Sequence, residues 1–258
     1  MLETKIIAES KPKLKNPICV VGLPGIGNIG RIAIGYVIQQ LKAKKFAELY
    51  SPNFFAFVMI HENKLHVLRN EFYYHKGKKR DYIFIIGDTQ AYDQDGHYEV
   101  AAKILEFLKS LGCKEVVTIG GFGTGKVVDK PQVYASATDE SLVKIYKKYG
   151  VNFNLNGKIT TIVGASGLIA GLSTQYDMKG ICLLGETTGY PIITDPTAAE
   201  AVLQVLKKSL ELDVDMKKLD DKVKAMHDFI KKLETIQQQA TEQIKSTGKK
   251  KEELKYIG

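Results

Sequence analysis

The stretch PICVVGLPGIGNIGRIAIGYVIQQL, residues 17–41, decides the fold class. It opens with an apolar run rich in valine and isoleucine, which predicts a strand over 17–22. After a glycine-rich turn, apolar residues recur with helical spacing over 27–41. Strand, tight turn and helix in this order form the unit from which α/β folds are built. The stretch therefore predicts an α/β protein.

The segments that follow continue this alternation. Strands are predicted over 46–50, 54–61, 64–74, 82–87, 115–120, 158–163 and 181–185, and helices over 96–111, 139–149 and 195–210. A two-residue turn at Glu62 and Asn63 indicates an antiparallel hairpin, whereas continuous apolar runs such as 82–87 indicate strands covered on both faces. We therefore expect a three-layer α/β domain with a mixed, mostly parallel sheet and helices on both faces.

The C-terminal region has a different pattern, in which apolar side chains recur every seven residues. Such a narrow stripe is typical of a coiled-coil seam. Its partner is either the globular domain or the same helix in a second subunit, and we favour the second. The expected domains are an α/β body over 1–212, an amphipathic helix over 213–247 and a flexible partner-binding tail over 248–258. The predicted oligomerisation contacts are Leu219, Val223, Met226, Ile230 and Leu233.

Composition narrows the classes of function. The net charge is +8, but only three of 37 basic residues are arginine, and arginine makes most specific base and phosphate contacts. We therefore expect no nucleic-acid partner. No apolar run approaches the roughly 18 residues of a membrane span, and the charged first residues lack a secretory pattern, so we expect no membrane association and a cytoplasmic location.

Neither metal nor cofactor is predicted. The histidines show no metal-ligand spacing. The cysteines, Cys19, Cys113 and Cys182, stand singly beside apolar segments, which indicates buried free thiols.

The turn in the opening stretch matches GxGxxG, because Gly25, Gly27 and Gly30 lie between a predicted strand and a predicted helix. With Glu48 about twenty residues further on, the pattern is typical of a dinucleotide site. The alternative is a tight turn that packs the helix closely on the sheet. We favour the structural interpretation, because a hairpin follows instead of a second βαβ unit.

Two further motifs are near misses. Residues 120–126 spell GGFGTGK, but Val127 stands where a P-loop needs Ser or Thr. We interpret Gly121, Gly123 and Gly125 as structural too. Ser166 lies in a nucleophile-elbow-like turn, yet His227, the partner in chain order after Asp195, falls inside the heptad helix.

Five segments resemble the archaeal proteasome assembly chaperone family: LPGIGNIG (23–30), YIFIIGDTQ (82–90), VVTIGGFGTG (116–125), GASGLIAGL (164–172) and LLGETTGYPIITDPTAAEAVL (183–203). The resemblance implies a phosphorylase-like α/β fold without an established catalytic set, in a protein that binds proteasome α subunits and helps them assemble. The heptad seam adds the expectation of a homo-oligomer. The predicted function is therefore an ATP-independent proteasome assembly chaperone or adaptor, and not an enzyme. The alternative is a nucleotide- or nucleoside-binding enzyme that uses the Gly25–Gly30 loop.

The resemblance also implies a binding mode. Family members engage the α ring through a C-terminal hydrophobic-Tyr-any motif. In this chain Tyr256 is third from the end, and a lysine precedes it. Burial of the Tyr256 ring and pairing of the Gly258 carboxylate with a lysine suit insertion into a pocket. The predicted partner-binding residues are Leu254, Lys255, Tyr256, Ile257 and Gly258.

Overall fold

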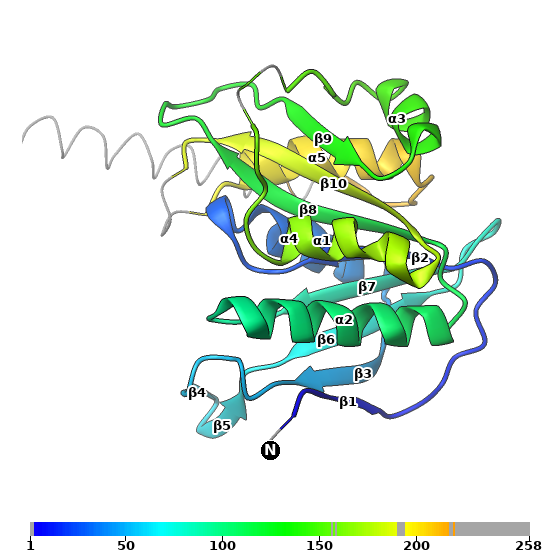
Figure 1. Ribbon diagram of the computed structural model, residues 1–258, viewed down its shortest axis with the longest axis vertical. Coiled ribbons are helices and arrows are strands. Elements are labelled where there is room, and N and C mark those ends of the chain that lie inside the picture. The colour runs from blue at the N-terminus through cyan, green and yellow to red at the C-terminus, as the bar shows by residue number, and fades with distance from the viewer. Residues whose placement is uncertain (1–2, 156, 158, 190–193, 217–218, 220–258) are drawn as a thin grey trace, which may run out of the picture. The chain divides into compact units, whose positions relative to one another are not determined.

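The computed structural model describes residues 3–155, 157, 159–189, 194–216 and 219 (Figure 1). The chain divides into two compact units, Met1–Met216 and Lys217–Gly258. The strands of the first unit are β1 (Lys5–Ala8), β2 (Ile18–Gly22), β3 (Lys44–Tyr50), β4 (Val58–His61), β5 (Lys64–Val67), β6 (Asn70–His75), β7 (Tyr82–Gly87), β8 (Glu115–Gly123), β9 (Val133–Ala137) and β10 (Lys179–Thr187). The helices are α1 (Ile29–Leu41), α2 (Gln94–Ser110), α3 (Glu140–Lys147), α4 (Ala165–Leu172) and α5 (Pro196–Ser209), with 3₁₀ turns at Ile26–Asn28 and Ser173–Tyr176.

Eight strands form the main sheet, in the order β1-β3-β6-β7-β2-β8-β10-β9. The four strands β7, β2, β8 and β10 pair in parallel, and the remaining pairs are antiparallel. Following these pairings, β3 runs with the four parallel strands, while β1, β6 and β9 run against them. The mixed, mostly parallel sheet that the sequence predicts is confirmed.

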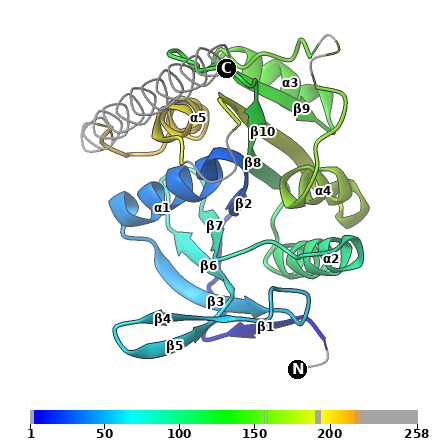
Figure 2. The same cartoon turned by 90° about the vertical axis from the view of Figure 1, so that its left-hand side faces the viewer.

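Helices cover both faces of the sheet. Figure 2 shows α1 and α5 side by side on one face, and α2 and α4 on the other. Every residue of β2 is buried, β7 and β10 are buried over most of their length, and β8 is buried over Val116–Ile119. A parallel strand that is sandwiched in this way has no solvent face, which explains why the sequence of β2, ICVVG, is apolar without alternation. The three-layer arrangement is therefore also confirmed.

Aspartates define three of the helix starts. The side chains of Asp93 and Asp195 accept hydrogen bonds from the backbone N–H groups of Gly96 and Ala198, and Asp139 caps α3 in the same way. Each bond satisfies an N–H group that has no partner inside the helix. The helix predicted over 195–210 is confirmed, with Asp195 as its capping residue and Pro196 as its first helical residue.

Several predicted strand bounds are wrong. Residues 54–57 lie outside any strand, and the predicted strand 64–74 is two strands, because β5 pairs only with β4 while β6 joins the main sheet. The described part of 158–163 contains no strand. The short edge strands β1 and β9 were not predicted, because four or five residues of mixed polarity give little periodic signal.

No helix among the described residues is long and apolar enough to cross a membrane.

Candidate functional site

The glycine-rich turns gather at one edge of the sheet, where the parallel strands β2, β7, β8 and β10 end and the loops over 23–28, 88–93 and 124–132 begin (Figure 1). We call this region the glycine-rich edge. In open α/β sheets the carboxyl ends of parallel strands are the usual place for ligands. The positions of the residues in this region therefore show whether the GxGxxG and GGFGTGK motifs could bind a dinucleotide or a phosphate.

Three of the six glycines singled out in these motifs, Gly30, Gly121 and Gly123, permit close backbone approach. A Cβ at Gly30 would lie 3.0 Å from the Cα of Gly22 and 3.1 Å from the carbonyl oxygen of Ile119. A Cβ at Gly121 would lie 2.4 Å from the carbonyl oxygen of Ile26. Helix α1 and the turn before it thus rest directly on β2 and β8. At Gly123, a Cβ would lie 2.9 Å from the Cα of Gly189.

The other three glycines have different local roles. Gly27 has a φ of 66°, in the left-handed region that favours glycine, and Gly125 has a φ of 72°. Gly25 is extended, with a φ of −172°, a conformation that any residue adopts. Its Cβ would meet only the amide nitrogen of Gln90, at 3.5 Å. In the GxGxxG pattern, Gly27 thus forms a turn, Gly30 allows a close backbone contact, and Gly25 has no steric need to be glycine.

The polar side chains of the glycine-rich edge bind one another's loops. The Oδ2 of Asp195 accepts a hydrogen bond from the Thr187 hydroxyl at 2.6 Å, and the Asp195 backbone N–H donates to the carbonyl of Gly27 at 2.7 Å. The Gln90 side chain accepts from the N–H of Ala165 at 2.9 Å and donates to the carbonyl of Pro24. These hydrogen bonds connect the loops after β2, β7 and β10 with one another and with the start of α4. A bound phosphate would need N–H donors at this place, and the donors named here are already used within the chain.

Asp88 also interacts with other residues of the same chain. Its Oδ1 lies 3.4 Å from a guanidinium nitrogen of Arg31, and its Oδ2 accepts from the backbone N–H of Arg69 at 3.2 Å. Of Asp88, Gln90 and Asp195, only Asp195 was singled out from the sequence; Asp88 and Gln90 entered only as part of the segment 82–90. The available signal for Gln90 was its place three residues after the end of a buried parallel strand.

Glu48, the residue that would bind the ribose in a dinucleotide site, does not lie beside the Gly25–Gly30 loop. It lies on β3, which is separated from β2 by β6 and β7. Its Oε1 is 2.6 Å from the Lys45 ammonium and 3.2 Å from the Arg69 guanidinium. Burial alone would raise the pKa of Glu48, but hydrogen bonds from Lys45 and Tyr50 and the nearby Arg69 charge lower it overall. The dinucleotide interpretation therefore loses its acidic residue.

The second motif is a strand and not a phosphate loop. β8 continues through Gly123, so most of the predicted loop GGFGTGK pairs with β10. The next helix after Lys126 begins at Glu140, and without an adjacent helix N-terminus the loop lacks the dipole and the N–H groups of a P-loop.

The nucleophile elbow is not supported either. The Ser166 hydroxyl would lie 3.0 Å from a Cβ at Gly120, and the Ser166 carbonyl accepts from the Thr118 hydroxyl at 2.7 Å. Ser166 thus lies where α4 approaches β8 closely. Asp195 caps α5, and His227 lies outside the described residues.

Metal and thiol chemistry find no support in the described part of the chain. It contains no cluster of three or more His, Cys, Asp or Glu side chains that could hold a metal. Cys19, Cys113 and Cys182 are buried and free, as predicted. Burial raises the pKa of each thiol, that of Cys113 to about 11, so the reactive thiolate is disfavoured.

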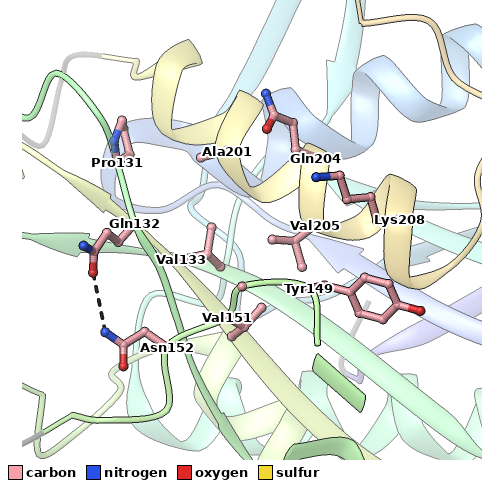
Figure 3. Close-up of a pocket in the computed structure, with 11 residues that line it drawn as sticks. Pro131, Gln132, Val133, Tyr149, Val151, Asn152, Ala201, Gln204, Val205 and Lys208 are labelled. Carbon is pink, nitrogen blue, oxygen red and sulfur yellow. Dashed lines mark hydrogen bonds between the residues drawn. The ribbon is translucent and has the colours of Figure 1, made fainter. Parts of the chain in front are cut away.

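Two of the pockets on the described surface adjoin the glycine-rich edge, one through Gln132 of the 124–132 loop and the other through Gly164, which lies beside Gln90. The one in Figure 3, about 590 Å³, lies between the start of β9, the 149–152 loop and α5. Its polar side chains are Gln132, Tyr149, Asn152, Gln204 and Lys208, with an amide–amide hydrogen bond of 3.5 Å from Asn152 to Gln132. A second pocket of about 580 Å³ lies between α2 and α4 and is mainly apolar. No Asp or Glu side chain lines either pocket, so neither pocket contains a carboxylate that could act as a general acid or base.

The predicted interaction residues lie almost entirely outside the described residues. The tail residues 254–258 and the seam residues Val223, Met226, Ile230 and Leu233 are among the undescribed positions, and Leu219 alone of the seam is described. Their roles remain predictions.

Comparison with known proteins gives a consistent result. The model of the PAC2 family matches residues 19–234. An uncharacterized protein of Methanocaldococcus jannaschii is 34% identical over 256 residues, which cover 99% of this chain and 97% of that protein. Pyrococcus furiosus PbaB, an archaeal proteasome activator, has a crystal structure that matches with a TM-score of 0.85 and 41% identity, covering 91% of this chain and 100% of that one.

A more distant structure, Pyrococcus furiosus PbaA, is described as an archaeal homolog of proteasome-assembly chaperone. It matches with a TM-score of 0.74 and 25% identity over 99% of this chain and 100% of that chain.

Proposed function

The chain belongs to the PAC2 family, and we propose that it acts as an ATP-independent proteasome assembly chaperone or adaptor that binds proteasome α subunits. The observation that carries this proposal is the similarity to the archaeal proteasome activator PbaB, which extends over the whole of that chain. The similarity to an archaeal homolog of proteasome-assembly chaperone points in the same direction.

The glycine-rich edge supports a role without catalysis. Its carboxylates Asp88, Asp93 and Asp195 cap helices or hold loops, and most of its glycines form turns or allow close backbone approach. A catalytic site needs polar groups that are free to act on a substrate in addition to those that hold the fold. We therefore assign no reaction to this edge, and function would reside in contacts with other macromolecules.

We assign the main partner contact to the C-terminal residues Leu254, Lys255, Tyr256, Ile257 and Gly258. An aromatic ring combines a large apolar surface with a polar hydroxyl, which suits a pocket between protein subunits. If the chain forms oligomers, several tails could bind one ring, and the effective concentration of the second tail would raise the overall affinity.

The experiment is a binding assay between purified α-subunit assemblies and three forms of the chain: intact, lacking residues 254–258, and with the preceding KKKEE (249–253) replaced by a Gly–Ser segment of equal length. We expect binding by the first and third forms and its loss in the second. Equal binding by all three would remove the tail from the mechanism, whereas no binding by the intact chain would contradict the proposed function itself.

A thermal-shift panel of nicotinamide, adenine and guanine nucleotides tests the enzymatic alternative. A ligand that binds only the folded state raises the melting temperature. We expect no nucleotide to do so. A shift with one nucleotide that disappears in a Gly27→Val variant would restore the Gly25–Gly30 loop as a binding site.

A further inference from the structure

The β4–β5 hairpin carries an uncovered apolar face. Val58 pairs with Val67 and Ile60 pairs with Leu65, so these four side chains lie on the same side of the two-stranded sheet. Their exposed fractions are 45% for Val58, 53% for Val67, 75% for Ile60 and 72% for Leu65. On the opposite side, Met59 packs against the hydrophobic core. The hairpin thus rests on the body by one face and presents the other to solvent.

An aromatic group adjoins this face. Phe55 and Phe57, just before β4, stack with ring centroids 6.2 Å apart, and Tyr92 lies 6.3 Å from Phe55. All three rings are more than half exposed, at 53%, 57% and 58%. We call the whole surface the hairpin patch: Phe55, Phe57, Val58, Ile60, Leu65, Val67 and Tyr92. It lies at the end of the first unit that carries β1 and β3 (Figures 1 and 2).

The area of the hairpin patch is in the range of a specific interface. Such an interface buries about 800 Å² on each partner. A fully exposed aromatic side chain alone offers about 150–250 Å², so seven large side chains that are 45% to 75% exposed provide an area of that order. Scattered apolar residues on a surface need no explanation, but a contiguous apolar patch of this size marks an interaction site.

The backbone of the hairpin leads to the same conclusion. β4 and β5 form a sheet of two strands, so each strand has an unpaired edge. Isolated two-stranded hairpins are marginally stable in water, and free edges readily pair with another chain. The turn is well formed, because Glu62 and Asn63 both adopt the positive φ, 49° and 61°, of a two-residue hairpin turn. A hairpin with a regular turn and an exposed apolar face indicates that another protein chain covers this face.

Charge selects the kind of partner. The hairpin, residues 58–67, carries one acidic and one basic side chain, Glu62 and Lys64, so it has no net charge, although the whole chain carries +8. A strongly acidic partner would be matched by an excess of basic residues, which the hairpin does not have, whereas an apolar face with balanced charge is complementary to itself. At the hairpin tip, Glu62 and Lys64 provide one charge of each sign, so two tips related by a two-fold axis can pair oppositely.

We propose that the hairpin patch is the contact between two copies of this chain. A two-fold axis brings the same patch of both copies together, which buries the apolar face and allows the free strand edges to approach. The proposal rests on neither the C-terminal tail nor the seam residues, and it is independent of the proposed function.

The test compares two double variants of the full-length chain. Ile60→Asp/Leu65→Asp places charges in the centre of the hairpin patch. The control, Val127→Asp/Val163→Asp, makes the same charge change at two valines that are 58% and 90% exposed elsewhere. Sedimentation equilibrium over a concentration series gives the mass and the dissociation constant of each form, and circular dichroism checks folding.

We expect association of the hairpin variant to be at least about tenfold weaker, because burying an unpaired charge is costly, and the control to match the unmodified chain. Equal masses for all forms would overturn the proposal, including the case in which the C-terminal heptads alone hold the copies together. A monomeric unmodified chain would also overturn it. So would a hairpin variant that keeps its mass but loses binding to a different protein.

Hydrogen exchange of the unmodified chain provides a second measurement that does not depend on a variant's folding. Amides of residues 58–67 should exchange more slowly at concentrations where the chain is associated than at high dilution. Identical exchange at both concentrations would contradict the proposal.

Discussion

The glycine-rich edge and the β4–β5 hairpin use their side chains in opposite ways. At the edge, Asp195, Gln90 and Asp88 hold loops of the same chain. On the hairpin, apolar side chains such as Ile60 and Leu65 are mostly exposed. The region whose sequence resembles a nucleotide site uses these polar side chains to hold its own loops, whereas the hairpin, which has no such motif, leaves apolar side chains exposed. The following experiments test this contrast, from the largest expected effect to the smallest.

Gly22→Ala should have the largest effect. A Cβ at this position would lie 2.2 Å from the carbonyl oxygen of Gly30, a backbone atom that cannot turn aside. We expect the free energy of unfolding to fall by about 3 kcal/mol or more, measured by chemical denaturation. Gly171→Ala in α4 is the control, because its Cβ would meet nothing within 4 Å, and it should leave stability unchanged or slightly raised. Similar losses in both variants would mean that close packing at the edge is not the cause.

Asp195→Ala should cost about 2 kcal/mol of unfolding free energy, because it removes the cap of α5 and the partner of the buried Thr187 hydroxyl together. Asp93→Ala removes the cap bond to Gly96 in α2 and should cost about 1 kcal/mol. Denaturation curves of both variants give the difference. A smaller loss for Asp195→Ala than for Asp93→Ala would show that the link between β10 and α5 adds little.

Asp81 lies at the opposite end of the parallel strands, just before β7, and its contribution to the stability of the fold should depend on pH. It is 3% exposed and accepts hydrogen bonds from the backbone N–H of Lys15 at 2.7 Å and from the Lys76 ammonium at 3.0 Å. Burial alone would raise its pKa, but these bonds lower it below the ordinary value of 3.8. A carboxyl whose folded pKa is lowered stabilises the fold above its unfolded pKa, and this contribution is lost as the pH falls through the folded value.

Asp81→Asn should therefore cost about 1.5 kcal/mol at neutral pH and progressively less as the pH falls below 3.8. Denaturation at several pH values between 7 and 2 measures the difference, with the exposed Asp129→Asn as control. A cost for Asp81→Asn that does not change with pH would contradict the assignment of the lowered pKa.

Ile60→Thr should have the smallest effect on the stability of the single chain. Its side chain is 75% exposed, and threonine keeps the branched shape that strands favour. At protein concentrations low enough to keep the chain monomeric, we expect a change within about 0.5 kcal/mol. A loss above 2 kcal/mol under these conditions would show that the hairpin face is covered by its own chain.

Local patterns predicted much of the fold. The strand 82–87 was placed with its observed bounds, and the helix start at Asp195 and Pro196 was correct, because a continuous apolar run and a capping pair are local signals. The bounds of 54–61 and 64–74 were wrong, since aromatic and β-branched residues favour strands whether or not a neighbouring strand is available. β9 was missed because its pairing with β10 depends on residues more than forty positions away.

The candidate site divides in the same way. Gly25, Gly27 and Gly30 could be recognised in the sequence, but their use could not, because GxGxxG does not state whether the facing atoms belong to a phosphate or to Ile119 and Gly22. Glu48 has the right spacing in the sequence and the wrong strand in the sheet.

The sequence by itself determined the α/β class, the turns, the helix caps and the membership of the PAC2 family, because these depend on the order and identity of neighbouring residues. The tertiary structure alone decided that the polar groups of the glycine-rich edge bind one another and that the hairpin patch is left exposed. Both depend on which distant segments meet. The order of strands in the sheet determines that, and no local pattern encodes it.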